Sequence, residues 1–472
     1  MADTASSMIP ESQPSQALLV DLYELTMAAA YFEHRVDCRA TFELFVRHLP
    51  KTRTYLVAAG LEAALDYLEN LHFTEADIAF LREEPAFKTV SREFFEYLRE
   101  FRFTGDVQAM DEGTLVFAEE PILQVTAPVL AAQIVETYLL SVVNFETMIA
   151  SKAARVVTAA GGRGVLEFGT RRAHGPEAGV RAARAAYLGG CVATSNVMAG
   201  CRYGIPLAGT AAHSWTQVFP SERASFEALL ETFPGRAILL IDTYDLLAGA
   251  EIVAALGQPV PGVRLDSGDL LEKSRQVRAI LDRRGLTETR IVASGDLNEY
   301  KIAELVAQGA PIDNFGVGTD LSTSRDAPAL AVVYKLVETE RAGRVEYKTK
   351  FSEEKVHWPG RKQVHRFSAG GAYESDLLSR AGERFEGAEP LLRPVMIAGR
   401  RTVPRRSAVE IRAQVLDHLA RLPAPCRALS DAPSYPVKKS VELERLLDEV
   451  REQYFGASTQ PVRDERRSVG DE

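Results

Sequence analysis

A histidine closes a short run of small and apolar residues near the middle of the chain. The run reads "GIPLAGTAAHSW" (204–215), and its histidine is His213. Imidazole changes charge near neutral pH, so its position at the expected end of a buried strand calls for an explanation. A lone histidine is more often a satisfied core or surface residue. The interpretation therefore depends on which side chains occupy equivalent positions elsewhere.

Five further apolar runs carry their charged or hydroxyl residues in the same place, at the carboxyl end. The runs are "GVLEFGTRR", "AILLIDTYD", "PGVRLDSGD", "RIVASGDLN" and "DNFGVGTD". One polar residue after a strand is often only a helix cap, but the repeated pattern indicates a site. Counted with the run before His213, the polar ends are Glu167, Arg171, Thr210, Asp242, Asp245, Arg264, Asp266, Asp269, Asp296, Thr319 and Asp320.

The stretch "DNFGVGTDLSTS" (313–324) has the composition of a phosphate-binding loop. Gly316 and Gly318 allow a ligand to approach the backbone closely, and Thr319 offers a hydroxyl at the start of a helix. Backbone amides at such a turn favour an anion, and late loops of α/β barrels commonly hold phosphate. The alternative is a glycine-rich turn with a purely structural role.

The stretch "RLDSGDL" (264–270) places an arginine and carboxylates together. Arg264 and Asp266 alternate on an extended segment, so their side chains share a face. Carboxylates such as Asp266 and Asp269 could order the waters of Mg²⁺ or the hydroxyls of a ribose. The alternative is an Arg–Asp pair that neutralises itself beside a helix cap.

The stretch "EFGTRR" (167–172) adds an aromatic face and positive charge. Phe168 could stack on an aromatic ring, and Arg171 and Arg172 could bind anions. Together with the carboxylates and hydroxyls, this set fits a phosphorylated sugar combined with an aromatic acid. No GxGxxG motif follows the first strand, and neither a GxxxxGK[ST] motif nor a Ser-His-Asp pattern occurs.

The elements that position these residues are predicted from the same runs. Short apolar runs buried on both faces and alternating with helical segments are typical of parallel strands in βα units. Between residues 160 and 335 they predict a closed or nearly closed α/β barrel, with an open doubly wound sheet as the alternative. In a parallel barrel the strand carboxyl ends open onto one face, where the polar residues would converge.

The rest of the chain divides around this barrel. We expect a helix over "DLYELTMAAAYFEH" with a capping box from Asp21 and Glu24, strands in "EGTLVFAEEPILQVTAPVL", and a long helix over 129–150. After residue 335 the chain reads as polar and irregular, with a final helix near 438–454. The expected units are disordered tails at 1–16 and 458–472, an N-terminal α/β domain at 17–135, the barrel with the active site at 136–335, and a region at 336–457 that packs back on the N-terminal domain.

Composition narrows the function classes. The 472-residue chain has a formal net charge of −10, which argues against general nucleic-acid binding. Its four cysteines form no CxxC pair, which favours a reducing compartment and disfavours a structural zinc site. We see no signal-peptide pattern and no apolar run long enough to span a bilayer, so we expect a cytoplasmic protein with no membrane partner.

Taken together, these stretches resemble the nicotinate phosphoribosyltransferase family. The resemblance rests on "DLYELTMAAAYF", "EFGTRRAHGPEAG", "GTAAHSW", "RLDSGDL" and "GVGTDLSTS", in that order, and runs from about residue 18 to about residue 366. It implies the type II phosphoribosyltransferase fold: an irregular, incomplete TIM-like α/β barrel plus an α/β domain built from both chain ends. It also implies a homodimer with shared active sites, and transfer of phosphoribosyl from phosphoribosyl pyrophosphate to nicotinate, coupled to ATP hydrolysis in the presence of Mg²⁺.

The resemblance also implies roles for individual residues. His213 would be phosphorylated by ATP and, with Asp266 and Arg264, would form the catalytic set. Tyr23, donated by the partner subunit, and Phe168 would sandwich the pyridine ring, and Mg²⁺ would bind with pyrophosphate near Asp266 and Asp269. The remaining nicotinate contacts would be Thr210, Arg264, Ser195 and Asn196, and those to phosphoribosyl pyrophosphate Arg171, Asp242, Asp266, Gly295, Asp296, Gly316, Gly318 and Thr319.

One position bears on the choice between acid and amide. The related nicotinamide enzymes carry an aspartate where this chain reads "ATSNVMAG", with neutral Ser195 and Asn196. A carboxylate there would repel nicotinate, so its absence favours the acid. Use of nicotinamide or quinolinate remains an alternative, as does a non-catalytic protein that binds phosphoribosyl pyrophosphate on the same fold.

Overall fold

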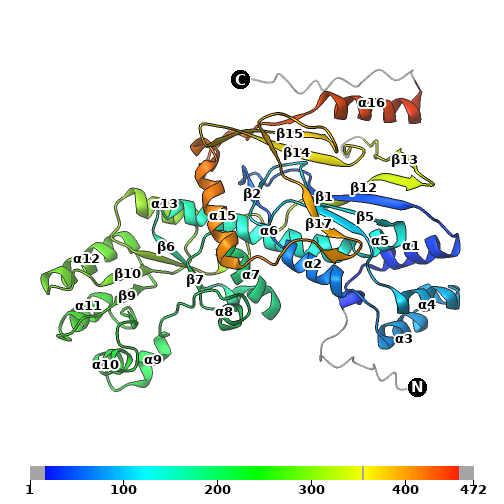
Figure 1. The fold of residues 1–472 in the computed structure, drawn as a ribbon. Helices are drawn as coiled ribbons and strands as arrows, with labels where there is room; N and C mark the ends of the chain where they lie inside the picture. Colours follow the sequence, from blue (N-terminus) through cyan, green and yellow to red (C-terminus); the bar gives the residue numbers. More distant parts are fainter. Residues whose placement is uncertain (1–15, 353–355, 457–472) are drawn as a thin grey trace, which may run out of the picture.

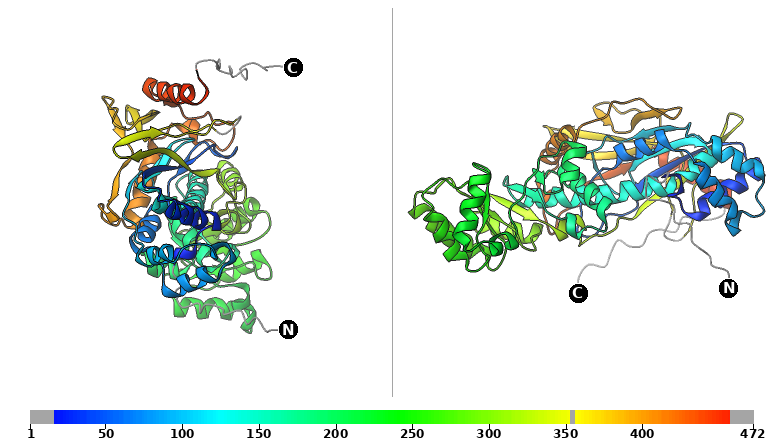
Figure 2. Two further views of the ribbon diagram at one scale, coloured as in Figure 1. Left: turned by 90° about the vertical axis from the view of Figure 1, so that its right-hand side faces the viewer. Right: turned by 90° about the horizontal axis from the view of Figure 1, so that it is seen from below.

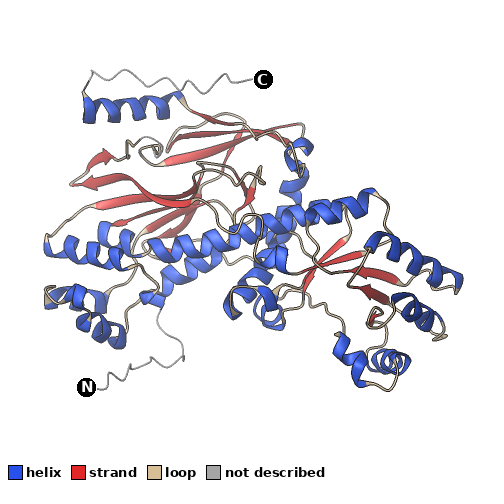
Figure 3. Ribbon diagram, turned by 180° about the vertical axis from the view of Figure 1, so that it is seen from behind, coloured by secondary structure: helices blue, strands red, loops and turns tan. Residues whose placement is uncertain are grey.

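The computed structural model describes residues 16–352 and 356–456. A parallel sheet lies at one end of an elongated molecule, and a β-rich region built from both ends of the chain lies at the other (Figures 1 and 2). The long helix α6 (Glu136–Ala159) connects the two, as Figure 3 shows from behind. The expected tails fall almost wholly outside the described residues, and the expected domain boundaries stay a prediction.

The predicted site is carried by a sheet of six parallel strands among the described residues, in the order β7-β6-β11-β10-β9-β8. The strands are β6 (Gly164–Glu167), β7 (Ala193–Thr194), β8 (Ile238–Leu240), β9 (Gly262–Leu265), β10 (Arg290–Ala293) and β11 (Asn314–Val317). The helices between and after them are α7 (Pro176–Leu188), α8 (Val197–Tyr203), α9 (His213–Val218), α10 (Glu222–Thr232), α11 (Leu246–Ala254), α12 (Leu270–Arg283), α13 (Glu299–Ala307) and α14 (Thr319–Ser322).

The strand order is that of a barrel left open along one seam. The first strand, β6, pairs with the last, β11, and each neighbouring pair in the sheet is parallel. The segment around Leu207 extends the sheet beyond β7 by a single parallel bridge to Thr194. Within the described part of the chain no strand pairing joins Leu207 to β8. The expected fold class, an incomplete α/β barrel with an α/β domain from both chain ends, is confirmed.

The run ending at His213 departs from the strand prediction. Only Leu207 makes a bridge there, because Gly204, Pro206 and Gly209 are poor strand formers and proline cannot donate a ladder hydrogen bond. The strand that pairs with β6 at this edge of the sheet is instead β7, which has two residues and is too short to be recognised from the hydrophobic pattern of the sequence. The other five predicted runs each contain a strand.

The β-rich end joins segments that lie far apart in the sequence. Its larger sheet has the order β13-β12-β1-β5-β3-β17-β18 and a smaller one the order β16-β14-β15-β19. The larger sheet consists of β1 (Arg39–Val46), β3 (Asp106–Ala109), β5 (Pro121–Pro128), β12 (Val332–Arg341), β13 (Arg344–Tyr347), β17 (Arg393–Ile397) and β18 (Arg400–Arg401). The smaller sheet consists of β14 (Lys362–Ala369), β15 (Ala372–Arg380), β16 (Ala388–Pro390) and β19 (Val437–Lys439), and β2 (Leu56–Val57) pairs with β4 (Leu115–Val116).

The prediction of an irregular region after residue 335 was wrong. Strands β12 to β15 contain many polar residues because part of their surface faces solvent, which hides the usual apolar signal. A tight turn at Gly370 and Gly371, both with positive φ, joins β14 to β15. The helices of this end are α1 (Leu22–Glu33), α2 (Leu61–Asn70), α3 (Glu75–Glu83), α4 (Arg92–Glu100), α5 (Val129–Ile134), α15 (Ala408–Arg421) and α16 (Val441–Phe455).

Helix α1 begins after Asp21 as predicted, but the expected capping box does not form. The Asp21 side chain makes no capping hydrogen bond, and the Glu24 carboxylate instead accepts from the hydroxyl of Thr137 at the start of α6. Burial raises the pKa of Glu24 to about 7. Glu24 therefore joins two helices rather than closing the end of its own.

The predicted long helix is longer than expected and has an unexpected property. Helices α5 and α6 together form an apolar stretch, Val129–Ala159, that is long enough by length and composition to cross a membrane. The prediction that no run reaches this length was therefore wrong. About two thirds (67%) of its most apolar window is buried inside the protein, and its interior side carries the charged residues Glu146, Lys152 and Arg155. These features are those of a core helix.

Candidate active site

Arg264, on strand β9, is held by three side chains from three segments. Its Nε donates to Ser294 Oγ (2.7 Å), Nη1 to Thr210 Oγ1 (2.8 Å) and Nη2 to Asp266 Oδ1 (2.7 Å). A guanidinium has five N–H donors, so each Nη keeps one without a partner among the described residues. A fixed pair of such donors matches the two oxygens of a carboxylate.

Phe168 lies beside this guanidinium, just after β6. Its backbone N–H donates to Val317 O (2.9 Å), and its ring centroid is 5.8 Å from Arg264 Cζ. A Cβ on Gly316 would lie 2.6 Å from the ring, so glycine is required at this position to make room for Phe168. The sequence predicted both residues, and the structure brings them together with Arg264.

His213 is the first residue of α9 and points toward the same carboxylate that binds Arg264. Its Nδ1 lies 3.2 Å from Thr243 Oγ1, and its Nε2 lies 3.9 Å from Asp266 Oδ2. The side chain is 43% exposed. Because Thr243 engages Nδ1, Nε2 is the nitrogen left open to a reactant.

Asp242 and Asp266 form the acidic side of the site. Asp242 Oδ2 accepts from the Asp266 backbone N–H and the Ser267 hydroxyl, both at 2.9 Å. Asp242 Oδ1 is buried and has no hydrogen-bond partner among the described residues. A buried oxygen without a hydrogen-bond partner is uncommon in folded proteins, and it leaves Asp242 Oδ1 able to contact a ligand of the site.

The loop after β10 approaches these carboxylates closely. Gly295 has a φ of +100°, and a Cβ on it would lie 2.1 Å from the Asp266 carbonyl oxygen. Asp296 also has a left-handed backbone, with a φ of 46°. Only glycine fits the first position, and the second stores strain of the kind found at functional sites.

The predicted phosphate loop lies at the carboxyl end of β11. Gly318 precedes the short helix α14, and Thr319 is its exposed first residue. Arg171 lies on the turn after β6, is exposed, and forms no side-chain hydrogen bond or ion pair with any described residue. Phosphate contacts by Thr319 and Arg171 stay predictions.

Ser195 and Asn196 follow β7 on the next strand end. Asn196 caps α8: its Oδ1 accepts from Ala199 N–H (2.8 Å), and its Nδ2 donates to Thr170 Oγ1 (3.0 Å). Ser195 is exposed, and its backbone N–H donates to Glu167 O (3.0 Å). Glu167 is buried, which raises the pKa of its carboxyl.

Three predicted residues lie differently from the rest. Asp269 caps α12 and Asp245 caps α11 through their side-chain oxygens, which is the structural alternative weighed for each strand end. Tyr23 lies on α1 at the β-rich end of the molecule, away from the barrel (Figure 1). The described chain therefore does not bring Tyr23 to its own site.

Ser294 and Thr243 were missed by the sequence analysis. Ser294 donates to Asp266 and accepts from Arg264, and Thr243 contacts His213. Both lie inside the polar strand ends "SGD" and "DTYD", where the hydroxyls stand next to aspartates, so their positions in these stretches would have indicated them. A metal-ligating group of three or more His, Cys, Asp or Glu side chains is absent from the described residues.

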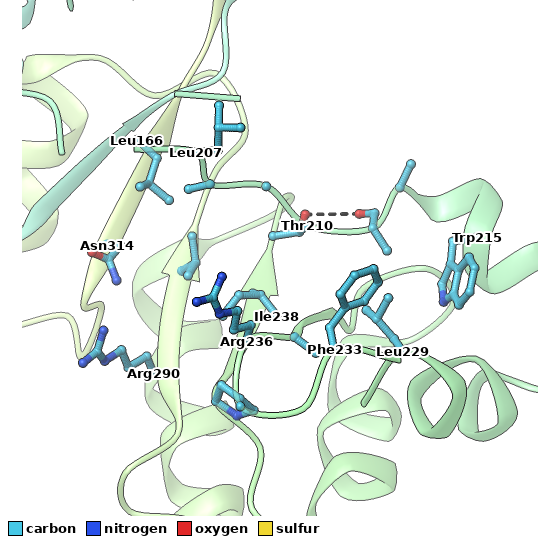
Figure 4. Close-up of a pocket in the computed structure, with 18 of the residues that line it drawn as sticks. Leu166, Leu207, Thr210, Trp215, Leu229, Phe233, Arg236, Ile238, Arg290 and Asn314 are labelled. Carbon is cyan, nitrogen blue, oxygen red and sulfur yellow. Dashed lines mark hydrogen bonds between the residues drawn. The ribbon is translucent and has the colours of Figure 1, made fainter. Parts of the chain in front are cut away.

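A large cavity of about 1690 Å³ lies along the open seam of the barrel, between the Leu207 segment and β8 (Figure 4). Leu166, Leu207 and Ile238 line it, and Arg236 and Arg290 reach its wall. Thr210 belongs both to this wall and to the contact with Arg264. Asp242, Asp266 and His213 are not part of its lining, so these groups belong to the neighbouring strand-end face.

Comparison with known proteins identifies the family. Models described as the nicotinate phosphoribosyltransferase N-terminal domain, family and C-terminal domain match residues 18–144, 164–350 and 382–447. The nicotinate phosphoribosyltransferase pncB2 of Mycobacterium tuberculosis is 46% identical over 432 residues, which cover 90% of this chain and 91% of that protein. The nicotinate phosphoribosyltransferase of Bacillus subtilis is 46% identical over 362 residues, covering 75% and 73%.

A solved structure gives the same result. The crystal structure of human nicotinic acid phosphoribosyltransferase superposes with a TM-score of 0.78 at 30% identity, covering 92% of this chain and all of that one. A nicotinate-nucleotide pyrophosphorylase from Pyrococcus furiosus superposes with a TM-score of 0.72 at 27% identity, covering 89% and 99%. The resemblance drawn from the motifs is thereby confirmed, and the chain is an enzyme that belongs to the nicotinate phosphoribosyltransferase family.

Proposed function

We propose that this enzyme transfers phosphoribosyl from phosphoribosyl pyrophosphate to nicotinate, giving nicotinate mononucleotide and pyrophosphate. The observation that carries the proposal is the fixed guanidinium of Arg264 beside the face of Phe168. That arrangement offers paired donors for a carboxylate and a flat surface for an aromatic ring, which are the two parts of nicotinate. The neutral Ser195 and Asn196 add no charge that would repel the acid.

In the proposed transfer, the pyridine nitrogen attacks the anomeric carbon as the bond from that carbon to the pyrophosphate oxygen breaks. Asp242, Asp266 and Asp296 would line the ribose and pyrophosphate side, and Gly316, Gly318, Thr319 and Arg171 the phosphate side. The positive charge that develops on the sugar is favoured next to carboxylates. Pyrophosphate release that depends on nicotinate tests the reaction, because a protein that only binds phosphoribosyl pyrophosphate would release none.

Magnesium fits the acidic side of this site. The buried Asp242 Oδ1 has no partner among the described residues, and carboxylate oxygens are ligands that Mg²⁺ and its waters accept. Asp266 would face the same ion, whereas Asp269 already accepts two backbone N–H groups as a helix cap. Bound with pyrophosphate, Mg²⁺ would neutralise charge on the leaving group.

We further propose that ATP phosphorylates His213 on Nε2. The γ-phosphoryl group would pass from ATP to this nitrogen, releasing ADP, and water would later cleave the N–P bond to release phosphate. The phosphoryl group adds about −1.5 to −2 charges near Asp266, which changes the electrostatics of the substrate site. The contact between Nδ1 and Thr243 supports the assignment of the reacting nitrogen.

The site is proposed to be completed by a second copy of the chain in a homodimer. Tyr23 lies too far along the molecule to reach its own barrel, and it is 46% exposed beside the exposed Leu19, Leu22 and Met27. An exposed apolar cluster of this kind marks an interaction surface.

We also propose a cytoplasmic location, which agrees with the four free cysteines in the described chain.

Mixing two inactive variants tests the shared site. In a dimer of one Tyr23→Ala and one His213→Ala subunit, one site carries both substitutions and the other carries neither. We expect ATP-coupled activity to reappear on mixing and dissociation–reassociation, up to about a quarter of the wild-type value if subunits exchange randomly. Mixtures that stay as weak as the separate variants would show that Tyr23 does not complete the site of a partner subunit. A Tyr23→Ala variant as active as the wild type would show that Tyr23 serves no site.

A further inference from the structure

A largely buried cluster of charges lies between α6 and the two loops assigned to phosphoribosyl pyrophosphate. Lys152 Nζ donates to Glu299 Oε2 (2.6 Å) and Asp326 Oδ1 (2.9 Å), and it lies 3.6 Å from Asp320 Oδ1. The Lys152 side chain is 1% exposed and that of Glu299 is fully buried. An ammonium group so far from solvent is retained only where anionic partners surround it.

Two arginines complete the cluster. Arg53, also 1% exposed, binds both oxygens of Asp326 at 2.6 and 3.0 Å, and Arg155 Nε donates to Glu299 Oε1 (3.3 Å). The three cations face three carboxylates, so the cluster is neutral as a whole. Partial burial disfavours the charge on Asp326, but the hydrogen bonds and charges of Arg53 and Lys152 outweigh it and lower its pKa.

The partners of Lys152 lie in or next to the two loops assigned to phosphoribosyl pyrophosphate. Glu299 is the first residue of α13 and directly follows the loop with Gly295 and Asp296. Asp320 and Asp326 lie within and just after α14, in the segment that begins at Thr319. Lys152, on α6, therefore binds the two loops to one helix, and Arg53 adds the segment before β2.

Both loops contain a residue that needs such support. Asp296 and Ser324 have positive φ values of 46° and 43°, although neither is glycine. The fully buried Ser324 donates to Ala327 O (2.9 Å) and accepts from Arg53 Nη2 (3.4 Å). Sparsely populated backbone conformations persist where the surrounding structure holds them in place.

We infer that Lys152 is a positioning residue for the phosphoribosyl pyrophosphate half of the site, acting through Glu299, Asp320 and Asp326. The inference rests on the proposed function for the role of the two loops. On this inference the two halves of the site are supported separately. Lys152 supports the loop with Gly295 and Asp296 and the segment that begins at Thr319. On the nicotinate side, Arg264 is held by Thr210, Ser294 and Asp266. Loss of Lys152 also leaves an unbalanced negative charge behind a loop that binds phosphate.

Lys152→Met tests the inference, with Lys362→Met as a matched control. Lys362 is also a buried lysine paired with a glutamate, with Nζ 2.7 Å from Glu43 Oε2, but it is the first residue of β14, in the β-rich end away from the barrel (Figure 1). Lys152→Met is expected to raise the KM for phosphoribosyl pyrophosphate about 10- to 100-fold, with nicotinate affinity close to wild type. Lys362→Met is expected to lower the Tm and leave both values unchanged.

Hydrogen exchange gives a second readout that needs no turnover. Amides of residues 295–299 and 317–326 are expected to exchange faster in Lys152→Met than in Lys362→Met at equal distance below their Tm. If Lys152→Met does not fold, Asp326→Asn is expected to give the same two effects more weakly. Equal exchange in these loops, or an unchanged KM for phosphoribosyl pyrophosphate, would overturn the inference.

The two readouts also distinguish this inference from the proposed function. A wild-type enzyme that neither binds phosphoribosyl pyrophosphate nor forms product would contradict the proposed function. Faster loop exchange in Lys152→Met would then still show that Lys152 holds the loops. Product formation by the wild type together with unchanged loops in the variant would contradict the positioning role alone.

Discussion

Replacement of His213 by alanine is expected to abolish the coupling of ATP hydrolysis to nicotinate mononucleotide formation while leaving the fold intact. The side chain is 43% exposed, so its removal leaves no buried cavity. It is also the histidine whose Nε2 faces Asp266 across 3.9 Å, so its loss removes the proposed phosphoryl acceptor. The measurement is the ratio of ATP hydrolysed to mononucleotide formed, with and without nicotinate.

A second histidine variant controls for non-specific effects of the substitution. His72 is exposed on the loop between α2 and α3, remote from the barrel. His72→Ala is expected to keep the wild-type coupling ratio. A His213→Ala enzyme that stays coupled like the wild type, and still incorporates phosphate from ATP, would remove His213 from the mechanism.

Replacement of Arg264 by alanine is expected to weaken nicotinate binding by about 1.5–3 kcal/mol, the range for hydrogen bonds to charged groups. The substitution removes the N–H pair proposed for the carboxylate and leaves Asp266 without its 2.7 Å partner. Arg264→Lys is expected to recover only part of the affinity, because an ammonium group cannot reproduce the planar fork. Titration calorimetry with nicotinate measures both variants.

Arg290 offers a matched control for the loss of positive charge. It lies on the neighbouring strand β10 and lines the cavity below the site rather than the strand-end face. Arg290→Ala is expected to leave nicotinate affinity unchanged. Equal affinity of Arg264→Ala and wild type would exclude Arg264 from the nicotinate pocket.

Much of the site was predictable because its residues occupy the same position, the carboxyl end of the strand, in successive βα units. The apolar runs predicted β6 and β8 to β11, and the carboxyl ends of parallel strands meet on one face. Arg264, Asp266, Phe168, Gly316 and His213 therefore converge as expected. The same rule predicts too many site residues, because Asp245 and Asp269 also follow strands but cap helices.

Other features depend on contacts that no local pattern records. The ion-pair partners Arg53, Lys152, Glu299 and Asp326 lie far apart in sequence, and in the sequence each resembles an ordinary surface charge. The stretch formed by α5 and α6 likewise meets the length and composition criteria for a membrane-spanning helix, although its residue Lys152 forms an ion pair with Glu299 inside the protein. Tyr23 illustrates a third limit, because its proposed role depends on a second copy of the chain.

The most direct test of the proposed function is a product assay on the purified protein. Phosphoribosyl pyrophosphate and Mg²⁺ would be supplied with nicotinate, nicotinamide or quinolinate, each with and without ATP. Nicotinate mononucleotide formed from nicotinate alone, in an amount increased by ATP, is the expected result. Product from nicotinamide instead would contradict the assignment of the acid-binding site around Arg264, Ser195 and Asn196, and product from quinolinate instead would contradict nicotinate as the acceptor. Absence of product with all three would contradict the proposed transferase activity.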